Sequence, residues 1–221
     1  MKRISVVKVL AAIACCLTAA TANAQVVTYS GFDLGASTLG PNSIAAQTSF
    51  RTATGGSIGI NFESALPAGV SRVGGTIRSV PSCAANLCGF NTTIAGANYL
   101  EGFGGTVTFT FGSGINYFGG YFSGLQLLNR IEFNDGSSQL VNMGFDAEFG
   151  GMGFAGFTDF NKLITSVTVN LNVGSNGDIA GIDDIIYGTK SASTTTPEPG
   201  TYAMLLVGFG MIGVVARRRR A

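Results

Sequence analysis

Apolar and polar residues alternate with a period of two along much of residues 25–188, and glycines interrupt the alternation. Residues 106–111 show the pattern most clearly, because Val107, Phe109 and Phe111 fall on one face of an extended chain and three threonines fall on the other. Such a pattern is typical of an antiparallel strand with one buried face and one solvent-exposed face. It predicts that the central part of the chain is built from β-strands.

Further short segments of this kind are expected to form strands: residues 26–32, 58–62, 76–80, 117–122, 131–133, 167–173 and 182–187. After residue 133, the sequence Asn-Asp-Gly-Ser is typical of a tight hairpin turn that returns the chain through Leu140 and Val141. We therefore predict a single all-β domain, an antiparallel β-sandwich or jelly roll.

The composition supports this fold class and excludes several kinds of chemistry. Glycine supplies 33 of the 221 residues and only 11% of residues are charged, which disfavours a helical bundle. The chain contains no histidine. Histidine is the usual base of serine and cysteine hydrolases and a common zinc ligand, so these sites in their usual forms are excluded.

The charges are distributed unevenly along the chain. Residues 25–196 hold six basic and eleven acidic residues, a net charge of −5, whereas the remaining basic residues lie near the two ends. Binding to nucleic acid depends on clustered cations that neutralise phosphates. We therefore expect no nucleic-acid partner for the central domain.

The N-terminus has the pattern of a secretory signal peptide. Three basic residues occur in the first eight positions, an apolar stretch covers residues 9–17, and Ala22-Asn23-Ala24 matches a cleavage site. We predict that residues 1–24 are a signal peptide. An uncleaved anchor and a lipid-modified Cys15 or Cys16 are the alternatives.

The C-terminus has the pattern of a short membrane anchor. Residues 200–216 contain no charged residue, and Arg217, Arg218, Arg219 and Arg220 follow them. A helix of this length extends about 25 Å, near the lower limit for crossing a bilayer. We predict a single transmembrane helix in contact with the lipid bilayer, with the arginines as a cytoplasmic stop and the domain on the periplasmic side.

Pro197-Glu198-Pro199, the apolar segment and the arginine cluster occur in this order at the very end of the chain. The tail resembles the PEP-CTERM protein-sorting signal of Gram-negative bacteria that make exopolysaccharide, also catalogued as the ice-binding protein C-terminal domain. The resemblance implies that an exosortase-type membrane peptidase recognises Pro197, Glu198 and Pro199. It further implies that the protein is then released or transferred to the cell surface.

These patterns predict four parts in the chain. Residues 1–24 form the signal peptide, residues 25–188 the β-sandwich domain, residues 189–196 a Ser/Thr linker, and residues 197–221 the sorting signal. The expected location is the cytoplasmic membrane, facing the periplasm, and then the cell surface or the medium.

Two cysteines remain after the signal peptide, Cys83 and Cys88. In an exported protein such a pair predicts a disulfide. A redox pair or a metal site is the alternative, but the four-residue spacing and the lack of other soft ligands disfavour both.

Acidic residues gather in two groups: Asp135, Asp146 and Glu148, and Asp178, Asp183 and Asp184. Calcium bound by such carboxylates is an alternative to solvated strand ends, but no Asp-x-Asp-x-Asp loop occurs. Asp183 and Asp184 are adjacent on a predicted strand, so we expect their side chains to point to opposite faces. We predict no metal site and no cofactor.

Three functions are weighed. The first is a non-enzymatic protein, structural or adhesive in the exopolysaccharide matrix, with no catalytic residue. The second is a carbohydrate-binding module in which exposed Tyr99, Tyr117 or Tyr121 stack on sugars, although each is also a candidate core residue. The third is a glycosidase-like enzyme with two facing carboxylates in a cleft.

Overall fold

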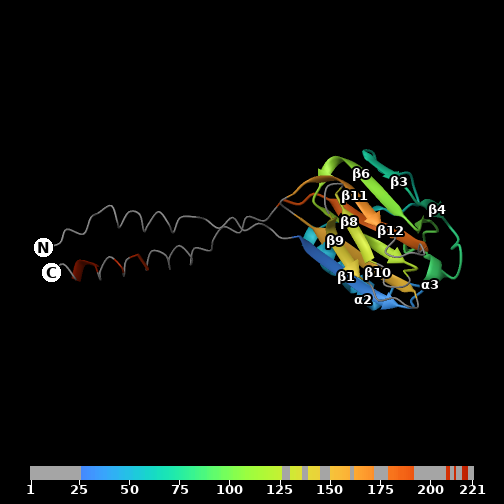
Figure 1. The fold of residues 1–221 in the computed structure, drawn as a ribbon, viewed down its shortest axis with the longest axis horizontal. Coiled ribbons are helices and arrows are strands. Elements are labelled where there is room, and N and C mark those ends of the chain that lie inside the picture. The colour runs from blue at the N-terminus through green and yellow to red at the C-terminus, as the bar shows by residue number, and fades with distance from the viewer. Residues whose placement is uncertain are drawn as a thin grey trace. The chain divides into compact units, whose positions relative to one another are not determined.

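The computed structural model describes residues 26–125, 130–135, 139–144, 150–159, 162–171 and 179–191, together with residues 208, 209, 212 and 216–218. The chain separates into two compact units, residues 1–190 and residues 191–221. All the described strands lie in the first unit (Figure 1), which confirms the all-β prediction for the central domain. The predicted signal peptide, residues 1–24, lies outside the described residues.

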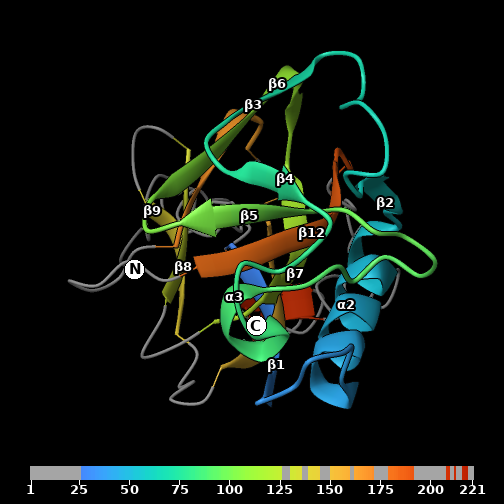
Figure 2. The ribbon, with the colours of Figure 1, turned by 90° about the vertical axis from the view of Figure 1, so that its right-hand side faces the viewer.

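The strands form two antiparallel sheets (Figure 2). The seven-stranded sheet has the order β1 (Val27–Leu34), β10 (Gly151–Thr158), β7 (Tyr117–Ser123), β12 (Ile179–Gly188), β5 (Tyr99–Phe103) and β4 (Thr76–Arg78), and β2 (Ile58–Ile60) also pairs with β12. The five-stranded sheet has the order β3 (Val70–Val73), β6 (Thr106–Ile115), β11 (Ile164–Asn170), β8 (Arg130–Asn134) and β9 (Gln139–Gly144). The predicted pairing of the strands on either side of the Asn-Asp-Gly-Ser segment occurs between β8 and β9.

The main core lies between the two sheets. Phe118 of β7 is fully buried, and its ring centroid is 5.8 Å from that of Phe109 and 5.6 Å from that of Phe133, both in the five-stranded sheet. Phe133 also lies 5.5 Å from Phe157 of β10. The inward positions of both sheets thus build one aromatic core, as the alternating pattern predicted.

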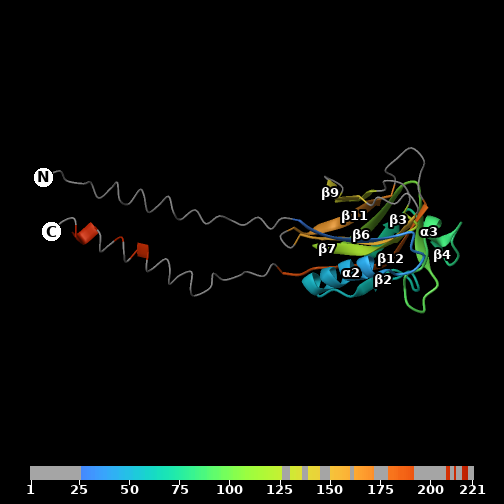
Figure 3. The ribbon, with the colours of Figure 1, turned by 90° about the horizontal axis from the view of Figure 1, so that it is seen from below.

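A helix that the strand pattern did not predict covers the other face of the seven-stranded sheet (Figure 3). This helix, α2 (Pro41–Thr54), buries Ser43, Ala46, Phe50 and Thr54, which recur at helical spacing. Phe50 packs edge-on against Tyr29 and Tyr117. The sheet is therefore covered on both faces in this region, by the five-stranded sheet and by α2.

The start of α2 is fixed by a residue of β1. Asp33 accepts hydrogen bonds from the backbone N–H groups of Asn42 and Ser43, at 3.0 Å and 2.9 Å. These are first-turn N–H groups that have no partner within the helix, and Pro41 at the first position supplies a suitable φ. Burial alone would raise the pKa of Asp33, but the hydrogen bonds from Ser43 and Asn42 outweigh it and lower that pKa.

Glycines in β7 and β10 allow α2 to approach the sheet. Gly119 pairs with Gly156, and a Cβ atom added to Gly156 would lie 3.0 Å from the Cα of Gly119 and 3.1 Å from the ring of Phe50. Both contacts are tighter than most side chains tolerate. Gly156 thus has a packing role beneath Phe50.

We predict that Phe118→Ala lowers the free energy of unfolding by about 3–5 kcal/mol, because it removes a fully buried ring and leaves a cavity between the sheets. Urea unfolding followed by circular dichroism measures this change. Leu163→Ala is the control, because Leu163 is exposed and its truncation is expected to cost less than about 0.5 kcal/mol. Equal losses in the two variants would contradict the assignment of the main core.

Candidate functional site

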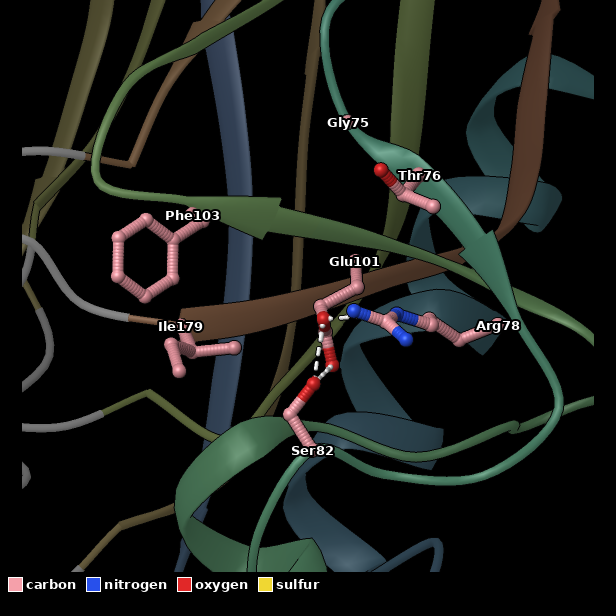
Figure 4. Close-up of a pocket in the computed structure, with 7 residues that line it drawn as sticks. All are labelled: Gly75, Thr76, Arg78, Ser82, Glu101, Phe103 and Ile179. Atoms are coloured by element: carbon pink, nitrogen blue, oxygen red, sulfur yellow. Dashed lines mark hydrogen bonds and ion pairs between the residues drawn. The ribbon is translucent and has the colours of Figure 1, made fainter.

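A pocket of about 360 Å³ opens at the β4 edge of the seven-stranded sheet (Figure 4). Its lining consists of Gly75, Thr76, Arg78, Ser82, Glu101, Phe103 and Ile179. Leu100 and Ile182 pack in the main core, so Glu101 of β5 and Ile179 of β12 project from the opposite face. The pocket therefore lies on the outer face of the sheet.

Glu101 forms the polar centre of this pocket. Its side chain is only 6% exposed, and it accepts a hydrogen bond from Arg78 Nε at 3.1 Å. Ser82 Oγ lies 2.7 Å and 2.8 Å from the two carboxylate oxygens, and the hydroxyl of Tyr99 lies 3.3 Å from Oε2. Burial, and then the negative charge of Glu101, raise the pKa of Tyr99 well above its ordinary value, so Tyr99 remains a neutral donor.

Strand register and a disulfide bring these residues together. Thr76 pairs with Glu101, and Arg78 pairs with Tyr99, so the β4 side chains line one side of the carboxylate. Ser82 comes from the loop before α3 (Ala85–Cys88). Cys83 and Cys88 are joined in a disulfide, as predicted, and this closes the loop next to Ser82.

Phe103 forms an apolar wall of the same pocket. It pairs with Ile179 across β5 and β12, and 76% of its surface is exposed. In Figure 4, Phe103 and Ile179 lie on one side of Glu101, whereas Arg78 lies on the other. Phe103 is not among the binding residues predicted from the sequence. Its position at the end of a strand, directly before Gly104-Gly105, is the signal that could have indicated an exposed ring.

The three tyrosines proposed as stacking surfaces do not have this role. Tyr99, Tyr117 and Tyr121 are 1%, 7% and 3% exposed, which agrees with the interpretation of each as a core residue and rules out the stacking alternative. Tyr117 and Tyr121 lie in the cluster between the seven-stranded sheet and α2. They face outward from the main core, but the helix covers them.

Asp183 and Asp184 lie together in β12, contrary to the expectation that they point to opposite faces. Both interact with the same two residues, Thr92 and Thr93. The reason is an irregularity in the β12–β7 register between Asp183 and Ile186, where Asp184 adopts a φ of 48°. An irregularity of this kind disrupts the regular alternation of side chains in a strand.

These two carboxylates are almost fully buried and bind a loop. Asp183 Oδ2 accepts from the backbone N–H of Thr92 at 2.8 Å, and Asp184 Oδ1 accepts from the hydroxyl of Thr93 at 2.7 Å. Burial raises the pKa of Asp183 to about 7, with a further contribution from the charge of Asp184. Burial also raises the pKa of Asp184. The pair thus attaches residues 92–93 to the sheet.

The remaining predicted acidic residues are only partly described. Asp135 pairs with Lys162. Asp146, Glu148 and Asp178 lie outside the described residues. Within the described ranges, no three His, Cys, Asp or Glu side chains are grouped so that they could hold a metal ion.

The predicted sorting residues and membrane span lie mostly outside the described part of the chain. This holds for Pro197, Glu198, Pro199, Arg219 and Arg220, whereas residues 208, 209, 212 and 216–218, which include Arg217 and Arg218, are helical. Among the residues that the structure describes, the helices lack the length and hydrophobicity that a membrane span requires.

Comparison with known families places a match at the same end of the chain. The model of the PEP-CTERM protein-sorting motif matches residues 195–220. The chain carries a PEP-CTERM sorting motif. The motif covers only the tail and implies an exported protein that is sorted by an exosortase. No curated protein and no solved structure matches the chain.

The buried pair Asp183 and Asp184 gives a testable pH dependence for the β-domain. Because the pKa of Asp183 is higher in the folded chain than its ordinary 3.8, ionisation of Asp183 opposes folding, and its contribution to stability declines as pH rises from about 4 to about 7. Asp183→Asn removes this ionisation but also loses an acceptor. We predict that Asp183→Asn has a lower free energy of unfolding than the parent chain, and that this difference is smaller at pH 8 than at pH 4.5. Urea unfolding at the two pH values measures the difference.

Asp33→Asn is the control for this measurement. The pKa of Asp33 is lowered by folding, so its stabilising contribution is complete above about pH 4 and is lost only as pH falls further. The deficit of Asp33→Asn should therefore not decrease between pH 4.5 and pH 8. If Asp183→Asn behaved in the same way, the assignment of a raised pKa to Asp183 would be wrong.

Proposed function

We propose that the protein is a non-enzymatic, structural or adhesive component of the extracellular polysaccharide matrix. The observation that carries this proposal is the PEP-CTERM motif at residues 195–220, attached to a compact β-domain that ends at residue 190. The tail directs the protein to the outside of the cell, and the β-domain performs its role there.

The proposed route begins with the signal peptide at residues 1–24 and continues with insertion of residues 200–216 into the cytoplasmic membrane. The arginines at 217–220 stop transfer and keep the β-domain on the periplasmic side. The exosortase then recognises Pro197-Glu198-Pro199. Two prolines separated by one residue cannot continue a helix or pair fully in a sheet, so the sequence predicts an extended segment that an enzyme cleft can bind.

The surroundings of the acidic residues support a non-enzymatic role. Asp183 and Asp184 are 1% and 3% exposed, and threonines of a neighbouring loop occupy their oxygens. Glu63 accepts from the backbone N–H groups of residues 97 and 98. These carboxylates hold loops in place, whereas a glycosidase needs two carboxyl groups that face a substrate across a cleft.

The outer face of the five-stranded sheet supports an adhesive role. Thr108 and Thr168 are paired across β6 and β11, with their hydroxyl oxygens 2.9 Å apart. Thr110 pairs with Ser166 on the same face, and Thr110 is exposed. A surface of uncharged hydroxyl groups can exchange hydrogen bonds with the hydroxyl groups of a polysaccharide without the cost of desolvating charges.

We predict that the mature protein loses its C-terminus only in a host that contains the exosortase. Intact-mass analysis of the membrane and secreted fractions should give a chain ending near residues 197–199 in the competent host and the complete C-terminus in an exosortase deletion. A Pro197→Ala, Pro199→Ala double variant should remain uncleaved. The linker variant Ser193→Ala, Thr194→Ala, which lies before the motif, should be processed normally. A complete C-terminus in both hosts would exclude exosortase processing.

We also predict that the processed protein stays with the polysaccharide. Most of it should sediment with the matrix of a polysaccharide-producing host and appear as free protein in the medium of a strain that makes no exopolysaccharide. Quantitative immunoblotting of the two fractions measures the shift. Equal retention in both strains would contradict the matrix role and leave exosortase processing unaffected.

A further inference from the structure

We infer that the pocket between β4, β5 and β12 binds a neutral saccharide chain, through an aromatic wall at Phe103 and a polar wall at Arg78. This inference rests on the proposed matrix function and identifies the site and the chemical class of its ligand. The pocket volume of about 360 Å³ lies within the range of small-ligand sites.

The pocket has one apolar wall and one polar wall, and a sugar ring likewise has one apolar side and one polar side. A pyranose has an apolar face of C–H groups and an edge of hydroxyl groups. Phe103 offers an exposed aromatic face, and Ile179 extends this apolar side. Because an exposed ring of this size is costly to leave in water, covering it with the C–H face of a sugar is favourable.

The polar wall offers hydrogen bonds at the opposite side. Arg78 uses Nε to bind Glu101, and its two Nη groups make no hydrogen bond to any residue in the described ranges. About half of the Arg78 side chain is exposed, so these donors are accessible. Ser82 donates its hydroxyl hydrogen to Glu101, which leaves its oxygen as an acceptor for a ligand hydroxyl.

The charges favour a neutral ligand over an acidic one. Within the pocket the charge of Arg78 is balanced by Glu101, which lies 3.1 Å away. The surrounding domain carries a net charge of −5 over residues 25–196 and would repel a polyanion. A neutral sugar chain meets neither the repulsion nor the cost of desolvating a carboxylate.

The site is held in place before a ligand arrives. Glu101 is buried and receives hydrogen bonds from three side chains, those of Arg78, Ser82 and Tyr99. Ser82 directly precedes Cys83, which the disulfide to Cys88 fixes to the end of α3. Since β4 is an edge strand, one side of the pocket faces away from the sheet, which suits a ligand that continues as a polymer. Preorganisation of this kind reduces the entropy lost on binding.

The test measures binding of defined oligosaccharides to the full chain in a detergent without a sugar headgroup. Isothermal titration calorimetry uses cellohexaose, mannohexaose and xylohexaose as neutral probes and hexagalacturonate as the acidic probe. Phe103→Ala removes the aromatic wall, and Arg78→Gln removes the guanidinium donors. Leu163→Ala is the matched control, because Leu163 is an exposed apolar residue beside Gly114, at the end of β6 away from Phe103.

We expect at least one neutral hexaose to bind, Phe103→Ala and Arg78→Gln each to weaken it roughly tenfold, and Leu163→Ala to bind as the parent chain does. Thermal unfolding confirms that the variants are folded. Absence of neutral-sugar binding, binding of hexagalacturonate alone, or binding unchanged in Phe103→Ala would overturn the inference. If Phe103→Ala bound the neutral hexaose as the parent chain does and still stayed with the matrix of a producing host, the pocket assignment would fail while the proposed matrix function would stand.

Discussion

Burial of the seven-stranded sheet on both faces is the constraint on which the rest of the domain depends. Every residue of β7 and β10 is buried, because these strands lie between the main core and α2. Such strands cannot carry bulky side chains everywhere. On the helix side, Gly156 leaves space for the ring of Phe50 and Gly119 leaves space for the ring of Phe154, and aromatic residues fill the space on the other side. The glycines and phenylalanines of β7 and β10 follow from that alternation.

The same constraint places polar groups in the interior, where each needs a partner. Among the described residues, no buried side-chain nitrogen or oxygen lacks a hydrogen bond. Asp33 uses the N-terminus of α2, and Asp183 and Asp184 use the Thr92–Thr93 loop. Backbone N–H groups and hydroxyls satisfy these carboxylates without a buried cation, which is consistent with the low charge of the chain. Acidic residues here connect helices and loops to the sheet.

The sequence predicted the strands better than the site. Alternation indicated β6 and the hairpin of β8 and β9, because one face of each is apolar. It missed α2, whose sequence is rich in serine and threonine and whose N-terminus is completed by Asp33, nine residues before Asn42. It also missed the irregularity at Asp184, since a positive φ leaves no mark in an aspartate. The pocket joins residues 75–82, 101–103 and 179, and only the pairing of β4, β5 and β12 brings these segments together.

The end of the β-domain shows how the tail can be removed without loss of the fold. β12 is the last strand and lies in the middle of the seven-stranded sheet, so fraying from its C-terminus would expose the core. Asn116 prevents this, because its side chain donates to the carbonyl of Lys190 at 2.8 Å and accepts from the N–H of Lys190 at 2.9 Å. The backbone N–H of Asn116 also binds the carbonyl of Gly188. All of these contacts precede the motif at residues 195–220. A cut near Pro197 therefore removes the sorting signal and leaves every described strand, the disulfide and the pocket intact.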